Sequence, residues 1–247
     1  MNLLNQITKC PNVQSCFTSE VDDHPCEKIV LSQKVSKEEF HVPEPWSGHL
    51  EKARILFLSS NPGVARQEKY PTSSWSADLV FDFFDNRFDS PNGWVKDGLF
   101  PLMTSGGYKA NWVRFWAAIR RRAVELLDRS DISPGVDYAI TEIVHCKSNN
   151  EIGVREALKE CMNQYLDKVL DLSGAKVVVC LGNRVSDAIR EKLNIPTTSK
   201  IHGPVITKKV KRYFAFLPHP NARGNRSFEK CMPDDLIALK RFLKCEQ

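Results

Sequence analysis

Short apolar runs alternate with amphipathic segments along most of this chain. The apolar runs are continuous, as expected of parallel strands buried on both faces of a sheet, and they span residues 53–59, 138–144, 175–181 and 212–217. The amphipathic segments carry apolar residues three to four positions apart, which predicts helices at residues 111–127, 153–172, 182–193 and 233–243. This succession predicts an α/β fold: a three-layer α/β/α sandwich around a short, mainly parallel, four-stranded sheet.

For two of the predicted helices, the sequence also predicts the position of individual side chains. In the segment 111–127, Trp112 and Trp116 fall on the apolar face, so we expect both tryptophans in the core rather than on a base-stacking surface. The segment 182–193 is expected to begin with Asn183 as its N-cap, because an asparagine side chain accepts a hydrogen bond from a free backbone N–H of the first turn.

The first 50 residues differ from the rest of the chain. They are polar, contain three cysteines and are interrupted by prolines at positions 11, 25, 43 and 45, which break any long helix or strand. We therefore expect residues 1–50 to be irregular and to form an N-terminal extension. This extension would pack on the main α/β domain, which spans residues 51–247.

Composition adds limits on the class of protein. With 247 residues, 42% of them hydrophobic and 26% charged, the chain is long enough to bury a core without cross-links. No apolar run approaches the roughly 20 residues of a membrane-spanning helix, and the N-terminus lacks the pattern of a secretory signal. We expect a monomeric cytoplasmic protein, or a nuclear one in a eukaryote, with no membrane partner. The net charge of +5 suits a polyanionic partner such as DNA.

Two of the predicted strands end at a polar residue next to a proline. The first run closes on Ser-Ser-Asn-Pro-Gly (residues 59–63) and the last on Leu-Pro-His-Pro-Asn (residues 217–221). Open α/β sheets assemble ligand sites at the carboxyl ends of their strands, which is where Asn61 and His219 fall. An amide in such a turn can hold a water molecule, and an imidazole fixed between prolines can donate a hydrogen bond to developing negative charge.

The eight cysteines indicate metal or cluster ligands together with core thiols, because the thiols of a cytosolic protein stay reduced. Cys146 follows the second apolar run, and Cys161 lies fifteen residues later on a predicted helix. Cys10, Cys16 and Cys26 lie in the N-terminal extension.

Together these motifs resemble the uracil-DNA glycosylase superfamily, and most closely its iron–sulfur branches. In that family an apolar strand ends in an Asn-Pro-Gly or related turn, a later strand leads to a cysteine, a helix carries another cysteine, a further strand leads to Leu-Gly, and a last strand ends in His-Pro. All five signals occur here in this order, at residues 61–63, 146, 161, 181–182 and 219–220. The resemblance covers about residues 53–243. It implies an enzyme that hydrolyses the N-glycosidic bond of uracil or another deaminated or damaged base in DNA, in base excision repair.

The resemblance implies roles for residues of the first and last turns. Asn61 would orient or activate the water that attacks the sugar C1′, and His219 would stabilise negative charge on the departing base. Ser60 and Gly63, in the same turn as Asn61, would contact the base.

The resemblance also implies an aromatic residue that stacks on the base and a loop that enters the duplex. Candidates for the stacking residue follow the first turn in the sequence: Tyr70, Trp75 and Phe81. The loop after His-Pro would contact DNA through Asn221, Arg223 and Arg226. Of these, Arg223 is best placed to fill the gap left by the base and to neutralise phosphate.

One position departs from the family's pattern. Where the resemblance implies an asparagine that reads the edge of a pyrimidine, this chain has Glu142, in Ile-Thr-Glu-Ile-Val-His-Cys. An ionised glutamate only accepts hydrogen bonds, so it would repel O4 of uracil. Four explanations stay open: burial protonates Glu142, the preferred base offers donors at this edge, another residue reads the base, or Glu142 points elsewhere.

For the cysteines, the resemblance implies a [4Fe–4S] cluster that pins the N-terminal arm to the main domain. Cys146 and Cys161 would supply one pair of ligands, and Cys10 and Cys26 the other, with Cys16 as a substitute. The family's pattern is matched incompletely, since no Cys-x-x-Cys occurs in this chain. The alternatives are a zinc ion, or no metal with Cys161 as a small core residue.

The sequence thus predicts a monofunctional DNA glycosylase, with alternatives that differ in substrate or in class. Because of Glu142, the excised base could instead be hypoxanthine, xanthine or a modified pyrimidine. A nucleic-acid-binding protein with the same fold and no turnover is the alternative from another class. A nucleotide-processing enzyme unrelated to repair is disfavoured, since no Gly-rich loop of the P-loop type occurs.

Overall fold

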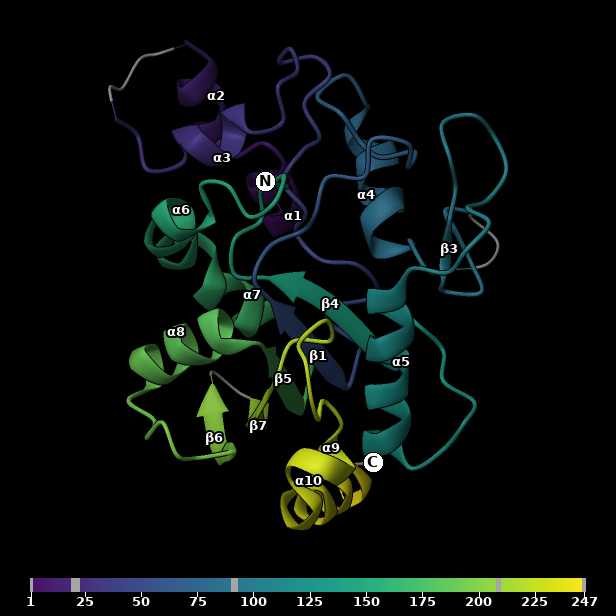
Figure 1. Ribbon diagram of the computed structural model, residues 1–247, viewed down its shortest axis with the longest axis vertical. Coiled ribbons are helices and arrows are strands. Elements are labelled where there is room, and N and C mark those ends of the chain that lie inside the picture. The colour runs from purple at the N-terminus through teal and green to yellow at the C-terminus, as the bar shows by residue number, and fades with distance from the viewer. Residues whose placement is uncertain (1, 19–22, 90–92, 208–209, 246–247) are drawn as a thin grey trace.

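A computed structural model of the chain describes residues 2–18, 23–89, 93–207 and 210–245 (Figure 1). Its centre is a five-stranded sheet in the order β4-β1-β5-β7-β6. These strands are β1 (Ile55–Ser59), β4 (Tyr138–Glu142), β5 (Val177–Leu181), β6 (Ile201–Thr207) and β7 (Val210–Leu217). The pairings of β4 with β1, β1 with β5 and β5 with β7 are parallel. Every residue of β1, β4 and β5 is buried, which agrees with their continuous apolar runs.

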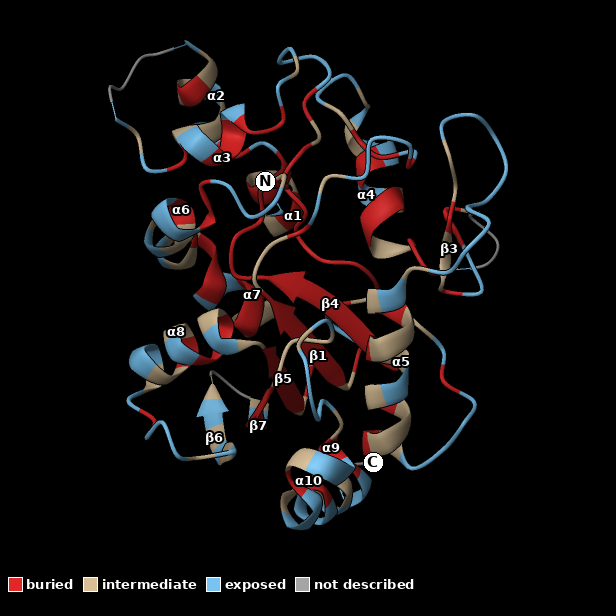
Figure 2. Cartoon of the chain, viewed as in Figure 1, coloured by how far each residue is buried: buried red, intermediate tan, exposed pale blue. Residues whose placement is uncertain are grey.

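The sheet has five strands rather than the predicted four, and the additional strand is β6. It pairs antiparallel with β7 at the edge of the sheet, and none of its residues is buried, in contrast to the central strands in Figure 2. An edge strand with a solvent-exposed face has no continuous apolar run. In β6, Gly203 and Pro204 also interrupt the pattern typical of a strand. The hydrophobic pattern alone therefore missed it.

Helices flank the sheet. In Figure 1, α5 (Arg114–Leu127) lies to one side of the strands, and α6 (Val154–Cys161), α7 (Asp167–Leu172) and α8 (Asn183–Leu193) lie to the other. The C-terminal helices α9 (Phe228–Cys231) and α10 (Pro233–Cys245) pack against α5. The remaining elements between β1 and α5 are α4 (Ala77–Asp85) and the hairpin of β2 (Val95–Lys96) and β3 (Phe100–Pro101). None of the helices in the described ranges is long and apolar enough to cross a membrane.

Local details of the helices differ from the expectations. The predicted helix 153–172 contains a π-helical segment, η2 (Met162–Leu166), between α6 and α7. The N-cap of α8 is Gly182 rather than Asn183, and it makes no side-chain cap bond because glycine has no side chain. Trp116 is buried as expected, whereas Trp112 precedes α5 and is 58% exposed, so its predicted place in the core was wrong.

The N-terminal 50 residues are more regular than expected. They contain three short helices, α1 (Leu3–Thr8), α2 (Pro11–Thr18) and α3 (Glu27–Leu31), whose buried side chains join the same core cluster as the sheet. Ser47 exchanges two backbone hydrogen bonds with Ile140 of β4, at 2.8 and 3.1 Å. The segment around Ser47 therefore covers the outer edge of β4 and satisfies backbone groups there.

Arg212 on β7 is a fully buried cation. Its two terminal nitrogens donate hydrogen bonds to the carbonyl oxygens of Leu170 and Ser173, at 2.8 and 2.9 Å. Carbonyl groups at the C-terminal end of a helix have no partner within the helix, so a cation placed there stabilises them. Arg212 therefore joins the end of α7 to the sheet.

Replacing Arg212 with leucine should lower the free energy of unfolding by about 2–4 kcal/mol, because two carbonyl groups would lose a charged donor. Chemical denaturation of the variant and the parent protein measures the difference. Lys211→Leu is the matched control: Lys211 is exposed on the same strand, and its replacement should change stability by less than about 1 kcal/mol. Equal stability of the Arg212→Leu variant and the parent would contradict the capping role.

Candidate functional site

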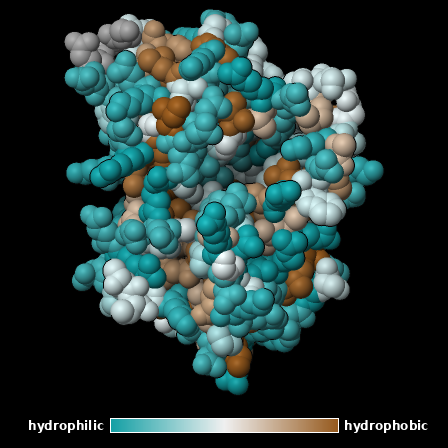
Figure 3. Space-filling model, viewed as in Figure 1, coloured by the Kyte–Doolittle hydropathy of each residue, from teal (hydrophilic) through white to brown (hydrophobic). Residues whose placement is uncertain are grey.

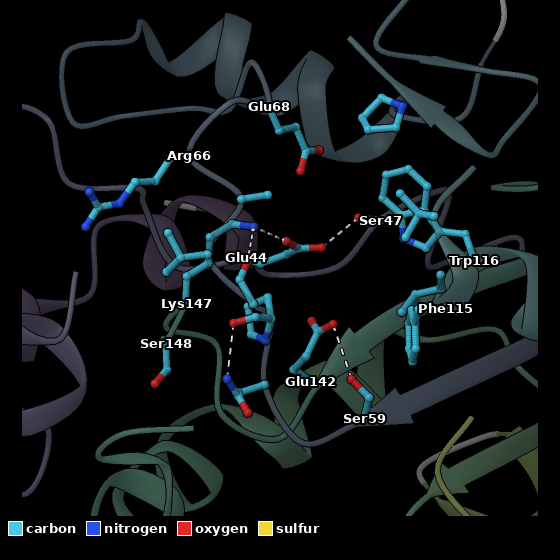
Figure 4. Close-up of a pocket in the computed structure, with 18 of the residues that line it drawn as sticks. Glu44, Ser47, Ser59, Arg66, Glu68, Phe115, Trp116, Glu142, Lys147 and Ser148 are labelled. Carbon is cyan, nitrogen blue, oxygen red and sulfur yellow. Dashed lines mark hydrogen bonds and ion pairs between the residues drawn. The ribbon is translucent and has the colours of Figure 1, made fainter. Parts of the chain in front are cut away.

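A cavity of about 740 Å³ opens where the parallel strands end. It is bounded by the turn after β1, the end of β4, the loop after β7, the start of α5 and the N-terminal segment that covers β4 (Figure 4). Asn61 and His219, which come from two separate sequence motifs, both line this cavity, and so does Glu142. The two turns therefore meet at one edge of the sheet, although β5 lies between β1 and β7.

The Asn-Pro-Gly turn is held by the segment that follows β4. The Ser148 N–H donates to the Pro62 carbonyl, and Lys147 Nζ donates to the Gly63 carbonyl, both at 3.1 Å. Asn61 Nδ2 donates to the Pro62 carbonyl at 3.1 Å. Asn61 Oδ1 accepts no hydrogen bond from the described residues, so it can accept one from a water molecule in the cavity.

His219 has a defined tautomer. Its Nδ1 accepts a hydrogen bond from the Asn221 N–H at 3.2 Å. Burial lowers the pKa of His219, although the charge of Glu151 acts in the opposite direction, so the ring is neutral at pH 7. A neutral imidazole that accepts at Nδ1 carries its proton on Nε2, which is then the donor. Gly182 makes room for this loop, because a Cβ there would lie 3.2 Å from the Cβ of His219.

Glu142 ends β4 beneath the cavity. It is 5% exposed, its Oε1 accepts a long hydrogen bond of 3.4 Å from Ser59 Oγ, and its Oε2 has no partner among the described residues. Burial, reinforced by the negative charge of Glu44, raises the pKa of Glu142 well above its ordinary value. Its surroundings therefore favour the neutral, protonated form of the carboxyl.

Glu44 anchors a buried ionic network that the sequence analysis did not anticipate. Its Oε1 accepts hydrogen bonds from Arg87 at 2.7 Å and from Ser47 at 3.0 Å, and its Oε2 lies 3.6 Å from Lys147 Nζ. Arg87 also pairs with Glu68 at 2.5 Å. Burial alone would raise the pKa of Glu44, but Arg87 and Lys147 outweigh it and hold this pKa below its ordinary value. Glu44 is therefore ionised while Glu142 is neutral.

The predicted stacking residues lie outside the cavity. Tyr70 is buried behind it, where its hydroxyl donates to Glu44 Oε2 at 3.1 Å and Lys147 Nζ lies 3.8 Å from its ring centre. Trp75 lines a different pocket and packs against Trp94 and Phe83, and Phe81 is exposed on α4. The described residues 64–89 contribute no aromatic side chain to the cavity, and Tyr70, Phe83 and Phe84 belong to the hydrophobic core instead.

The aromatic wall of the cavity comes from α5 instead. Phe115 lines the cavity and lies nearly parallel to the His219 ring, with the ring centres 5.8 Å apart and an angle of 22° between them. Trp116 lines the cavity beside it. The helical pattern had indicated the apolar face of α5, but a core position and a ligand-facing position give the same pattern. Only the tertiary structure separates the two.

Other predicted residues lie around the rim. Gly63 and Asn221 line the cavity, whereas Ser60 does not, and its hydroxyl accepts a hydrogen bond of 3.0 Å from Arg184. Arg223 and Arg226 are exposed in the loop after His219.

Two further exposed cations, Arg66 and Lys109, line the mouth of the cavity. Figure 3 shows hydrophilic side chains over most of this face, with apolar side chains in small separate patches. Trp112, which is exposed, lies in the same short segment as Lys109 and precedes the cavity-lining Val113.

Four cysteines form a second candidate site. Cys10, Cys26, Cys146 and Cys161 line one small cavity between the N-terminal helices and α6, and each is at most 9% exposed. Cys161 Sγ accepts a hydrogen bond of 3.4 Å from the His145 N–H. Burial and the neighbouring thiols raise the pKa of Cys26 to about 12, so a bound cation would be needed to stabilise the thiolates.

No group of three or more His, Cys, Asp or Glu side chains in the described part of the chain is placed to hold a metal ion. Cys16 does not line the shared cavity, and its Sγ lies 3.8 Å from Nδ1 of His24.

Comparison with known proteins leaves the family of the chain open. No family model matches the chain, and no curated protein matches its sequence. Any functional proposal for this protein therefore rests on its own motifs and on the geometry of the two sites.

The tautomer of His219 can be tested directly. At neutral pH its imidazole should be uncharged and protonated on Nε2, because burial lowers its pKa and the Asn221 N–H occupies Nδ1. A ¹⁵N NMR titration, with His219→Gln to assign the signal, should show this ring becoming charged only below about pH 6.5. A ring that is charged at pH 7, or that carries its proton on Nδ1, would contradict the assignment.

Proposed function

We propose that this protein is a monofunctional DNA glycosylase of the uracil-DNA glycosylase superfamily, which hydrolyses the N-glycosidic bond of uracil or another deaminated or damaged base. The observation that carries this proposal is that Asn61 and His219 line the same cavity from two different strand ends. One side chain can hold a water molecule and the other can donate to a leaving group, which are the two needs of this hydrolysis.

In the proposed reaction, the target nucleotide turns out of the duplex and into the cavity. The C1′–N bond breaks with its electron pair moving to the base, and the sugar develops oxocarbenium character. Asn61 Oδ1 orients a water molecule whose oxygen bonds to C1′, and the proton that this water loses passes to solvent. His219 Nε2–H donates a hydrogen bond to the negative charge on the departing base, which takes up a proton from solvent afterwards.

Two features of the cavity support the binding of a flat base and an attack by water rather than by a lysine. Phe115 provides an aromatic wall, on which a base can stack. Lys147 is 3% exposed, pairs with Glu44 and donates to the Gly63 carbonyl, so its amine is engaged in holding the turn rather than available as a nucleophile.

The fold and the rim also support the proposal. A mainly parallel sheet flanked by helices is compatible with the three-layer sandwich of this superfamily, and β6 adds an antiparallel edge strand to it. DNA is the proposed partner: the exposed cations Arg66 and Lys109 line the cavity, and Arg223 and Arg226 are exposed in the loop that follows His219, so these side chains can contact phosphates.

We further propose that the four buried thiols hold a [4Fe–4S] cluster. The donor set fits, because Cys10, Cys26, Cys146 and Cys161 face one cavity and the His145 N–H already donates to one sulfur. A single zinc ion would need the sulfurs roughly 3.8 Å apart, since Zn–S bonds are about 2.3 Å. A [4Fe–4S] cluster takes one thiolate at each of its four iron atoms, and four cysteines line this cavity. Its role would be structural, joining the N-terminal helices to the segment after β4.

Replacing Asn61 with alanine should lower the excision rate by about 100-fold or more, because the attacking water would lose its acceptor. Gel assays with oligonucleotides that each carry one uracil, hypoxanthine or xanthine measure the rate, and a binding assay should show DNA affinity within about threefold of the parent. Asn163→Ala is the control, because Asn163 is exposed on η2.

Two outcomes would contradict the proposed role of Asn61. One is full activity of Asn61→Ala. The other is a parent protein that binds DNA but excises none of the tested bases, which would favour the non-catalytic DNA-binding alternative.

The metal site has a test that does not depend on activity. Protein purified without oxygen should show the broad visible absorption of an iron–sulfur cluster and contain about four iron atoms per chain. Cys146→Ser should lose most of the iron and the absorption, whereas Cys16→Ser should keep both, since Cys16 does not line the thiol cavity. Stoichiometric zinc without iron, or loss of iron from Cys16→Ser alone, would overturn the assigned ligands.

A further inference from the structure

Glu142 lines the cavity but has no role in the proposed reaction. Its side chain points into the space below Glu44 in Figure 4 and lines the cavity. Its Oε2 is buried and has no hydrogen-bond partner among the described residues. A buried polar atom left without a partner is destabilising, so Oε2 marks a position where a bound ligand can supply one.

The other oxygen of the same carboxyl has a partner. The Ser59 hydroxyl donates to Glu142 Oε1 at 3.4 Å, and the parallel pairing of β1 with β4 aligns these two residues. The oxygen that accepts this bond is the carbonyl oxygen of a neutral acid, which leaves the hydroxyl on Oε2. The free side of Glu142 is therefore a hydrogen-bond donor.

The groups nearest Glu142 favour its neutral form. Burial is the main cause of its raised pKa, and ionised Glu44 adds to the effect. Lys147 and Arg87 act in the opposite direction, but both are already paired with Glu44. Tyr70, which also faces this network, has a pKa raised well above its ordinary value and is uncharged.

The other titratable groups around the cavity do not reverse this balance. Those that line it are Glu68, Glu151, His219, Arg66 and Lys109. The two glutamates are paired with arginines, and the histidine is neutral at pH 7. The two cations lie exposed at the mouth, where solvent and salt screen their charge.

We propose that Glu142 reads the target base as a neutral carboxylic acid, donating a hydrogen bond from Oε2 to a carbonyl oxygen of the base, and that the cavity therefore selects oxo bases over amino bases. The inference rests on the proposed function and names its substrate class. Deamination replaces an amino group by a carbonyl oxygen, at C4 in the change from cytosine to uracil and at C6 in the change from adenine to hypoxanthine. Oε2–H thus distinguishes a deaminated base from its parent.

The expected selectivity follows from the mismatch of donors. An amino group placed against Oε2–H would bring two donors together and leave both without an acceptor, a cost of roughly 1–3 kcal/mol, which corresponds to about 5- to 150-fold in affinity. An ionised Glu142 would reverse the preference, because a carboxylate accepts from an amino group and repels a carbonyl oxygen. The preference for oxo bases is therefore present below the raised pKa of Glu142 and is lost as the pH rises through it.

The protonation state is tested first, without any substrate. Infrared difference spectra of the full-length protein at pH 7.5 should contain the C=O stretching band of a protonated carboxylic acid. This band should be absent from Glu142→Gln and unchanged in Glu125→Gln, which removes a different partly buried carboxyl. A parent spectrum without such a band, or a band that survives in Glu142→Gln, overturns the proposal.

Selectivity is tested with free bases as probes. Uracil and cytosine, titrated into the parent protein by NMR at about pH 7, should differ in affinity by at least about 5-fold in favour of uracil. Glu142→Gln should keep this preference, since its amide also donates, whereas Glu142→Leu should lose it. Equal affinity of the parent for the two bases, a preference for cytosine, or binding of neither base overturns the proposal. An unchanged preference in Glu142→Leu also overturns it.

These readouts separate this inference from the proposed reaction. Both measure protonation or base binding in the absence of DNA, so they are independent of turnover. If the parent excises no base but shows the acid band and prefers uracil, the reaction fails and the base-reading role of Glu142 stands. If it excises bases but lacks the acid band, the reaction stands and this role fails.

Discussion

The structure of both sites depends on hydrogen bonding that continues between β1 and β4 beyond the ends of the two strands. After the pairing of Ser59 with Glu142, the next two residues of the segment 143–148 donate to the carbonyl groups of residues 59 and 60, at 2.9 and 3.0 Å. Further along, the Ser148 N–H donates to the Pro62 carbonyl at 3.1 Å. One segment therefore carries a cysteine of the thiol site and also holds the Asn-Pro-Gly turn, so the two sites share a single backbone support.

The same arrangement explains why two nearby carboxyl groups differ in charge. The N-terminal segment brings Glu44 against the end of β4, and Arg87 and Lys147 reach it from two other parts of the chain. Both cations pair with Glu44, so it keeps its charge in spite of burial. Within the part of the chain that the structure describes, Glu142 has only Ser59 as a hydrogen-bond partner, and it faces the negative charge of Glu44, so burial is the main influence on its pKa. The pKa values of the two glutamates thus shift in opposite directions because their surroundings differ.

Part of this molecule could be predicted because its signals are local. The parallel strands are continuous apolar runs, and the turns that follow β1 and β7 can be recognised by a proline next to a polar residue. β6 was missed because an exposed edge strand has no apolar run. The N-terminal helices were missed because each is only one or two turns long and begins or ends near a proline, so no amphipathic period develops. Their stability comes from packing on the main domain.

By itself, then, the sequence determined the α/β class, the parallel strands and the candidate roles of Asn61 and His219, since these follow from periodicity and from motifs within a few residues. The tertiary structure decided what depends on groups distant in the chain. It placed Phe115, rather than Tyr70, on the cavity wall, and it buried Glu142 beside Glu44, which raises the pKa of Glu142. A residue's type is local, whereas its solvation and its charged neighbours are properties of the folded chain as a whole.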